Sequence, residues 1–125
     1  MAANIENLLI CSGQNSSHQL GVPSDSASSK GHEIVQMPAA LSLSSKGLLA
    51  ISAGLRHSVL IYDDGKVFAI GDDRNDQIGC HKQDIFEIPT EIHLLLESTD
   101  EKILQAACGQ YYTAYLTNKG SIYIN

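Results

Sequence analysis

The chain repeats short sequence blocks in a fixed order, and this repetition constrains its fold more than any other feature. The stretch "GQNSSHQLG" at residues 13–21 recurs as "GDDRNDQIG" at residues 71–79, at an offset of 58. The stretch "AGLRHSVLIYDDGKVFAI" at residues 53–70 recurs as "CGQYYTAYLTNKGSIYIN" at residues 108–125, at an offset of 55. Because only the connecting lengths change, the sequence predicts a structural repeat of about 50 to 60 residues, which is in the range of propeller blades.

The local pattern within each block predicts β-structure. "HSVLIY" and "KVFAIG" are apolar, rich in β-branched and aromatic residues, and joined by "DDG", a signal for a tight hairpin. "TAYLT" and "SIYIN" repeat this arrangement around "NKG", and "LLAISAG" and "ILQAACG" predict one further buried strand per repeat. A third block, "MPAALSL" against "IPTEIHL", opens with Pro38 and Pro89, and proline is tolerated at the first residue of a strand or on an edge strand.

Apolar residues fall on both faces of these strands, which predicts sheets stacked face to face. We therefore expect an all-β chain in which each repeat is a small antiparallel sheet. The glycines are expected to form structural turns, at Gly13, Gly21, Gly54, Gly65, Gly71, Gly79, Gly109 and Gly120.

The stretch from Ala53 to Gly79 resembles the repeat of the regulator of chromosome condensation family. In that repeat AG-x-x-H-S/T is followed by an apolar strand, a DG-x-V-Y/F hairpin and a GQLG turn. The chain differs by having no Trp, by His18 and Asp76 at a glycine of the turn, and by Tyr112 at the histidine. The resemblance implies a seven-bladed β-propeller, of which this chain supplies about two blades.

We expect one incomplete propeller region over residues 1–125. Two blades alone would leave large apolar faces uncovered, because repeat proteins are stabilised by neighbouring units. We therefore expect the chain to continue after Asn125 into further repeats. The expected parts are the closing half of a first repeat at residues 8–21, a polar loop at 22–33, a second repeat at 37–79 and a truncated third repeat at 88–125.

Charge and composition argue against several classes of partner and compartment. The net charge of −6 argues against a broad basic surface for nucleic acid or anionic membranes. No apolar run approaches the ~20 residues of a membrane span. The N-terminus lacks the basic start of a secretory signal, so we expect an intracellular protein, cytoplasmic or nuclear.

The sequence offers no pattern for catalysis or for a cofactor, and we expect no catalytic residue, metal or cofactor. No phosphate-binding GxGxxG or GxxxxGK[ST] occurs, and Cys80 and His81 lack the spacing of a zinc site. Asp72, Asp73 and Asp76 are interrupted by Arg74 without the glutamate of a calcium loop. A turn held by aspartate side chains that accept bonds from backbone amides is the better interpretation.

Function is then expected in the loops, which gather on the two faces of a propeller. The family's prototype is a guanine nucleotide exchange factor for the GTPase Ran and uses acidic loop residues. The matching positions here include Ser16, Leu55 and Arg74, and none of them is acidic. His57 has two interpretations, a structural histidine bonded to a loop carbonyl or a residue of the binding surface. The candidate partner-binding residues are Ser16, Leu55, Arg56, His57, Asp73, Arg74, Gln110 and Tyr111.

We therefore predict a non-catalytic scaffold that presents its loops to a protein partner. The alternative is an exchange factor for a small Ran-type GTPase. Such a factor would displace the phosphate-binding loop and magnesium by binding the nucleotide-free GTPase more tightly.

Overall fold

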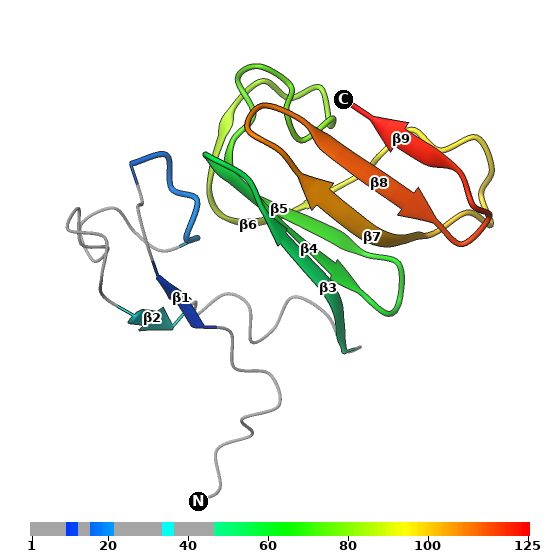
Figure 1. Ribbon diagram of the computed structural model, residues 1–125, viewed down its shortest axis with the longest axis horizontal. Helices are drawn as coiled ribbons and strands as arrows, with labels where there is room; N and C mark the ends of the chain where they lie inside the picture. The colour runs from blue at the N-terminus through cyan, green and yellow to red at the C-terminus, as the bar shows by residue number, and fades with distance from the viewer. Residues whose placement is uncertain (1–9, 13–15, 22–33, 37–46) are drawn as a thin grey trace, which may run out of the picture.

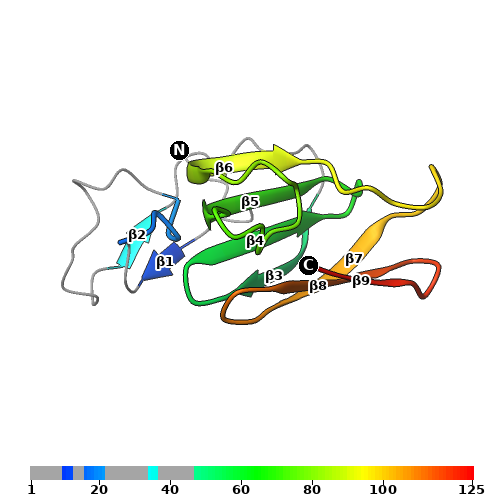
Figure 2. The same cartoon turned by 90° about the horizontal axis from the view of Figure 1, so that it is seen from above.

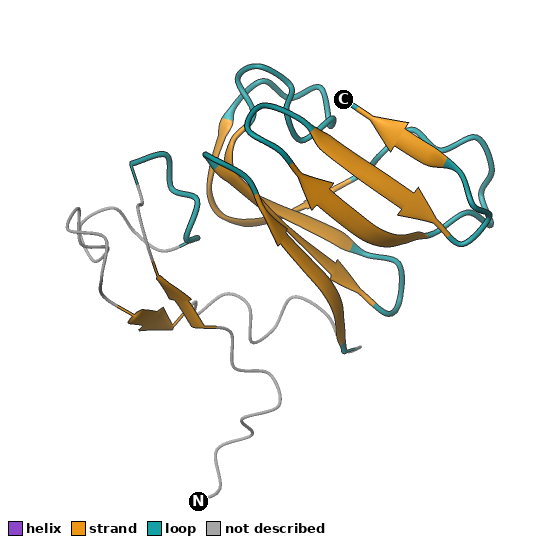
Figure 3. Cartoon of the chain, in the orientation of Figure 1, coloured by secondary structure: helices purple, strands orange, loops and turns teal. Residues whose placement is uncertain are grey.

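The computed structural model describes residues 10–12, 16–21, 34–36 and 47–125, and in this part of the chain it contains β-strands and no helix (Figures 1 and 3). All strand pairs are antiparallel, which confirms the all-β prediction. The strands are β1 (Ile10–Ser12), β2 (Ile34–Gln36), β3 (Leu48–Ala53), β4 (His57–Tyr62), β5 (Val67–Asp72), β6 (Ile85–Ile92), β7 (Ile103–Cys108), β8 (Thr113–Thr117) and β9 (Ile122–Ile124).

The described strands form three sheets. Sheet 1 is the pair β1–β2, sheet 2 has the order β3–β4–β5–β6, and sheet 3 has the order β7–β8–β9. Sheets 2 and 3 repeat the same hairpin, because Tyr62 donates its amide to Lys66 at 2.9 Å and Thr117 donates its amide to Ser121 at 3.0 Å. The recurrence at an offset of 55 is therefore a recurrence of three-dimensional structure.

Strand β6 differs from its prediction in where it begins. The sequence places the start of this strand at Pro89, whereas β6 begins four positions earlier, at Ile85. The register shifts between the pairs Ala69↔Thr90 and Gly71↔Phe86, so Pro89 lies in the irregular stretch. β6 is also the edge strand of sheet 2, where a missing backbone N–H costs no ladder bond.

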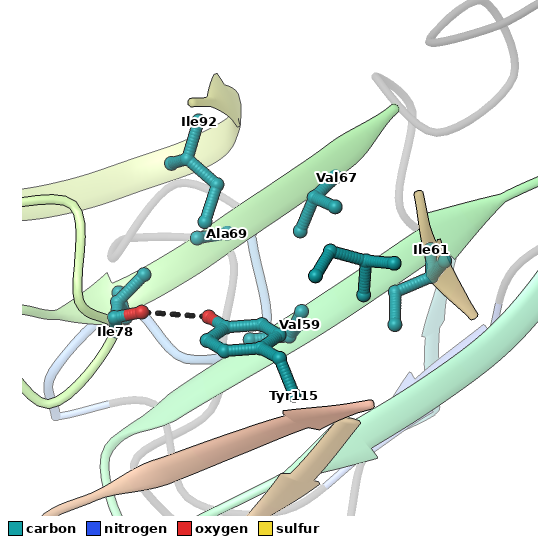
Figure 4. Packing of buried hydrophobic residues seen from close by; sticks show 8 residues of the cluster. Val59, Ile61, Val67, Ala69, Ile78, Ile92 and Tyr115 are labelled. Atoms are coloured by element: carbon teal, nitrogen blue, oxygen red, sulfur yellow. Dashed lines mark hydrogen bonds between the residues drawn. The ribbon is translucent and has the colours of Figure 1, made fainter. Parts of the chain in front are cut away.

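Sheets 2 and 3 stack face to face, as Figures 1 and 2 show, and their inner faces share one apolar core. Tyr115 of β8 is the largest fully buried side chain in the described residues, and its ring lies among aliphatic side chains of sheet 2 (Figure 4). The second faces of β4 and β5 are also buried, which fits strands that are apolar on both sides. The core residues are Val59, Ile61, Val67, Ala69, Ile78, Ile92, Ile103 and Tyr115.

The outward face of sheet 3 is apolar and exposed. Leu116, Ile122 and Ile124 are 36%, 66% and 69% exposed, respectively. β9 is also the last strand of its sheet in the described residues, whereas β6 covers the corresponding edge of sheet 2. Within the described residues, the outward face of sheet 3 and its edge at β9 are therefore uncovered. The equivalent face and edge of sheet 2 are covered, by sheet 3 and by β6.

A buried carboxylate organises the end of sheet 3 near the β8–β9 hairpin. Glu101 accepts hydrogen bonds from the hydroxyls of Thr117 at 2.7 Å and Tyr123 at 2.9 Å. These bonds, that of Thr117 foremost, hold the pKa of the Glu101 carboxyl below its ordinary value. The described residues contain no helix, and hence no helix that is long and apolar enough to cross a membrane.

Candidate interaction surface

Four connections gather at one end of the sheets, which we call the loop end. They are residues 16–21, 54–56, 73–84 and 109–112. The antiparallel pairing of β4 with β5 brings the second and third of them together, and the Asp72 amide donates to the Arg56 carbonyl at 2.8 Å. A Cβ atom on Gly54 would meet the carbonyl oxygen of Gly109, so the second and fourth connections touch through their backbones.

The two glycine-bounded turns have the same backbone structure. Gly21 donates its amide to the His18 carbonyl at 3.0 Å, and Gly79 donates its amide to the Asp76 carbonyl at 3.1 Å. His18 and Asp76 both have a positive φ, 58° and 57°. This left-handed conformation explains why the resembled repeat has glycine at this position.

Each of these turns is anchored on the sheet that follows it. The hydroxyl of Ser58 in sheet 2 donates to the Gln19 carbonyl at 3.1 Å. At the equivalent place in sheet 3, the Thr113 hydroxyl donates to the Gln77 carbonyl at 2.7 Å. Tyr115 adds a second anchor, because its phenol donates to the Ile78 carbonyl at 2.6 Å. The turns therefore join successive sheets and place the loops of the two units side by side.

A buried glutamine shapes each turn from within. The side-chain carbonyl of Gln19 accepts the amide of Ser17 at 2.8 Å, and that of Gln77 accepts the amide of Asn75 at 2.9 Å. Gln19 also donates its amide to the Leu55 carbonyl at 3.3 Å. The shared Gln at an offset of 58 was the available signal for this role, and sequence reasoning used it only to align the repeats.

His57 is a structural residue of the junction between sheets. It is 0% exposed, and its Nε2 lies 2.8 Å from the Thr113 hydroxyl. Because that hydroxyl donates its proton to Gln77, it accepts from His57, which places the imidazole proton on Nε2. Burial lowers the pKa of His57, against the opposing effect of Asp73 and Asp72. Of the two interpretations made from sequence, the burial of His57 matches the structural one, but the partner of Nε2 is the Thr113 hydroxyl and not a loop carbonyl.

Aspartate side chains hold the 73–79 turn, in agreement with the sequence interpretation. Asp73 is buried, accepts the Ile78 amide at 2.8 Å and accepts the Cys80 thiol at 3.1 Å. Burial raises the pKa of that thiol to about 12, so it stays protonated and is a poor nucleophile. Within the described residues, no group of three or more His, Cys, Asp or Glu side chains is placed to hold a metal ion.

Arg74 is held on the surface by a buried acid. Its Nε and Nη2 donate to the two carboxylate oxygens of Asp72 at 2.9 and 2.8 Å. The side chain of Asp72 is 2% exposed, whereas that of Arg74 is 56% exposed. The bond from Arg74 is the main reason that the pKa of Asp72 lies below its ordinary value. The pair fixes one guanidinium in place with its remaining N–H groups facing solvent.

The structure divides the predicted binding residues into two sets. His57 and Asp73 are buried, so they do not form part of a contact surface within the described chain. Tyr112 is 52% exposed, although it is not among the candidate binding residues that the sequence indicated. The predicted binding residues that are exposed at the loop end are Ser16, Leu55, Arg56, Arg74, Gln110 and Tyr111.

The glycines predicted as turns also fall into two sets. Gly54 and Gly109 serve close approach, because a Cβ atom on Gly54 would meet the His57 ring and one on Gly109 would meet the Tyr112 ring. Gly13 lies outside the described residues. Positive φ angles occur at Gly21, Gly65, Gly71, Gly79 and Gly120. Gly71 lies within β5 and not in a turn, so its predicted turn role is wrong.

Comparison with known proteins agrees with the repeat structure. Two matches to the family described as "Regulator of chromosome condensation (RCC1) repeat" cover residues 64–116 and 49–77. The human RCC1-like G exchanging factor-like protein is 33% identical over 119 residues, which is 89% of this chain and 25% of that protein. The human probable E3 ubiquitin-protein ligase HERC6 is 31% identical over 111 residues, 88% of this chain and 10% of that protein. The chain thus spans a quarter or less of these relatives.

Solved structures show the same fold. The crystal structure of human WBSCR16 matches with a TM-score of 0.68 at 19% identity, over 94% of this chain and 32% of that one. Prp20p from Saccharomyces cerevisiae matches with a TM-score of 0.65 at 20% identity, over 88% of this chain and 26% of that one. The chain therefore belongs to the regulator of chromosome condensation (RCC1) repeat family, and its fold is that of the RCC1 β-propeller proteins.

Proposed function

We propose that this chain is a non-catalytic interaction scaffold that presents its loop end to a protein partner. The observation that carries the proposal is the exposure of large side chains on a rigid base. Leu55, Tyr111 and Tyr112 are 46%, 49% and 52% exposed, and the two connections that carry them are closed by backbone hydrogen bonds from Gly54 to His57 and from Gly109 to Tyr112. Aromatic and arginine side chains on a pre-organised surface are the residue types that dominate protein interfaces.

The names of similar proteins support a protein partner. The structure of Prp20p was described together with its binding properties to Gsp1p and histones, and that protein was also crystallised with Kap60. These statements concern Prp20p. For the present chain they make a protein surface the first partner class to test.

Site-specific photo-crosslinking tests the scaffold proposal. A photoreactive amino acid at Tyr111 should capture a defined protein in cells, whereas the same group at Lys66 in the β4–β5 hairpin, at the opposite end of sheet 2, should not. A Leu55→Asp substitution should abolish the capture, since it places a charge in the contact surface. Equal capture at both positions, or none at Tyr111, would contradict the proposal.

A second candidate function is guanine nucleotide exchange on a small Ran-type GTPase. The specific observation in its favour is the 33% identity to a protein named as an RCC1-like G exchanging factor-like protein. Against it, the exposed loop residues Ser16, Leu55 and Arg74 are not acidic. The complete protein should be mixed with a Ran-type GTPase loaded with a fluorescent nucleotide. Acceleration of nucleotide release would support exchange activity, and an unchanged release rate would remove it.

A further inference from the structure

Four side chains of the loop end, those of Leu55, Arg56, Tyr111 and Tyr112, lie on two adjoining connections, and we call this group the ridge. These residues come from equivalent connections of sheets 2 and 3, and the contact between Gly54 and Gly109 holds the two connections together. All four side chains are exposed. The Tyr112 ring packs against Gly109, so part of the aromatic surface is fixed by the backbone beneath it.

Two arginine side chains, Arg56 and Arg74, are exposed beside the ridge. None of the ion pairs among the described residues involves Arg56, which is exposed. Its neighbour Arg74 is held by Asp72, whose carboxylate is buried and already bonded. The Arg56 carbonyl accepts the Asp72 amide, so the two arginines flank one sequestered acid. Both guanidinium groups therefore belong to exposed side chains next to the ridge.

The acids of the loop end are less exposed than the two arginines, with the exception of Asp84. Asp73 is buried and bonded, and Asp76 accepts the amide and ring nitrogen of His81. Asp84 is exposed, but it lies immediately before β6. One strand, β5, separates β6 from β4, whose start adjoins Arg56. Two strand spacings are about 10 Å, which is comparable with the screening length at physiological salt.

We propose that the ridge binds an acidic segment of a partner protein. A partner carboxylate would accept hydrogen bonds from Arg56, and an adjacent apolar or aromatic side chain would pack on Leu55 and the two tyrosines. This inference rests on the proposed scaffold function and adds the chemistry of the partner. The net charge of −6 opposes the approach of an acidic segment at long range, so its selection depends on short-range contacts with the ridge.

Selection from a library of short random peptides displayed on phage tests this proposal with the complete protein as bait. Enriched peptides should carry Asp or Glu beside an aliphatic or aromatic residue. Synthetic copies should bind about tenfold or more weakly to Arg56→Glu than to the wild-type protein. The matched control is Lys66→Glu, a charge reversal at an exposed site of the opposite end, which should bind as wild type does.

The remaining outcomes separate the two proposals. Peptides that are basic or uncharged, and that lose binding in Tyr111→Ala but not in Arg56→Glu, would overturn the acidic partner while the loop end remains a binding surface. A selection with no peptide sensitive to any loop-end substitution would overturn both. Unchanged thermal midpoints of Arg56→Glu and Tyr111→Ala exclude unfolding as the cause of lost binding.

Discussion

Thr113 of sheet 3 bonds Gln77 of the 73–79 turn and is also bonded to sheet 2. The Thr113 hydroxyl donates to the Gln77 carbonyl at 2.7 Å and accepts from His57 Nε2 at 2.8 Å. One hydroxyl thus joins β4, the turn and β8. Its environment is fully buried, so each lost bond leaves an unsatisfied polar group.

Thr113→Val should destabilise the protein by about 1 to 3 kcal/mol, because it leaves the His57 N–H and the Gln77 carbonyl without this partner. The substitution preserves the shape of the side chain, so little of the effect comes from packing. Urea unfolding monitored by circular dichroism measures the change. Thr113→Ser keeps both bonds and should cost only about 0.8 kcal/mol for the lost methyl group. An equal loss in both variants would show that the hydroxyl contributes nothing.

Tyr115→Phe should cost about 1 to 2 kcal/mol, because the phenol donates to the Ile78 carbonyl at 2.6 Å in a fully buried site. Burial also raises the pKa of Tyr115, so the hydroxyl keeps its proton throughout the ordinary pH range. Thermal unfolding of the two proteins gives the difference. Tyr111→Phe, at a half-exposed site, is the matched control and should change stability by less than about 0.5 kcal/mol.

The lowered pKa of His57 predicts a loss of stability at mildly acidic pH. The unfolded chain binds a proton at the ordinary histidine pKa of about 6.5, whereas the folded chain binds it only at lower pH. The unfolded state therefore holds more protons in this window, and the free energy of unfolding should fall as pH drops from about 7 towards the lower folded pKa. The carboxyls of Asp72 and Glu101, with lowered pKa values, contribute only at more acidic pH.

Unfolding titrations in urea at a series of pH values check the assignment. His57→Gln should remove the slope in this window, and the exposed His93→Gln should retain it. A slope that persists in His57→Gln would assign the proton uptake to another group.

Gly71→Ala and Gly120→Ala should separate steric conflict from backbone strain. Both glycines have positive φ, 100° and 84°. A Cβ atom at Gly120 would meet nothing, so its substitution should cost about 1 kcal/mol from the left-handed backbone alone. A Cβ atom at Gly71 would collide with the carbonyl of Arg56, so that variant should lose clearly more stability and should shift the ridge. Equal losses in chemical denaturation would contradict this reading of the site.

The repeat offsets predicted much of the fold because they carry long-range information within one sequence. Gly65 and Gly120 mark equivalent hairpins, and both adopt the positive φ that the turn requires. The turn chemistry of the 73–79 segment followed from the hydrogen-bonding habits of aspartate, which are local. Apolar residues on both faces of the strands supplied the expectation of stacked sheets, and the core that sheets 2 and 3 share confirms it.

The rest depended on contacts that no local pattern contains. The sequence assigned a turn role to Gly54, whereas the approach of Gly109 and the His57 ring is the reason that no side chain fits there. Likewise, Tyr112 aligned with His57 but one is half exposed and the other fully buried. The difference arises because His57 has sheet 3 packed against it, and the described residues include no further sheet against Tyr112.

The anchoring of each turn on the following sheet has a consequence for engineering. The exchangeable module of this architecture does not coincide with the sequence repeat, because the 73–79 turn belongs structurally to sheet 3. In a chimera that imports β7–β9 from another protein without the preceding turn, the residue at position 113 would face a Gln77 carbonyl from a different protein. Grafts should therefore cut upstream of Asp73, so that a turn and its receiving sheet travel as one piece.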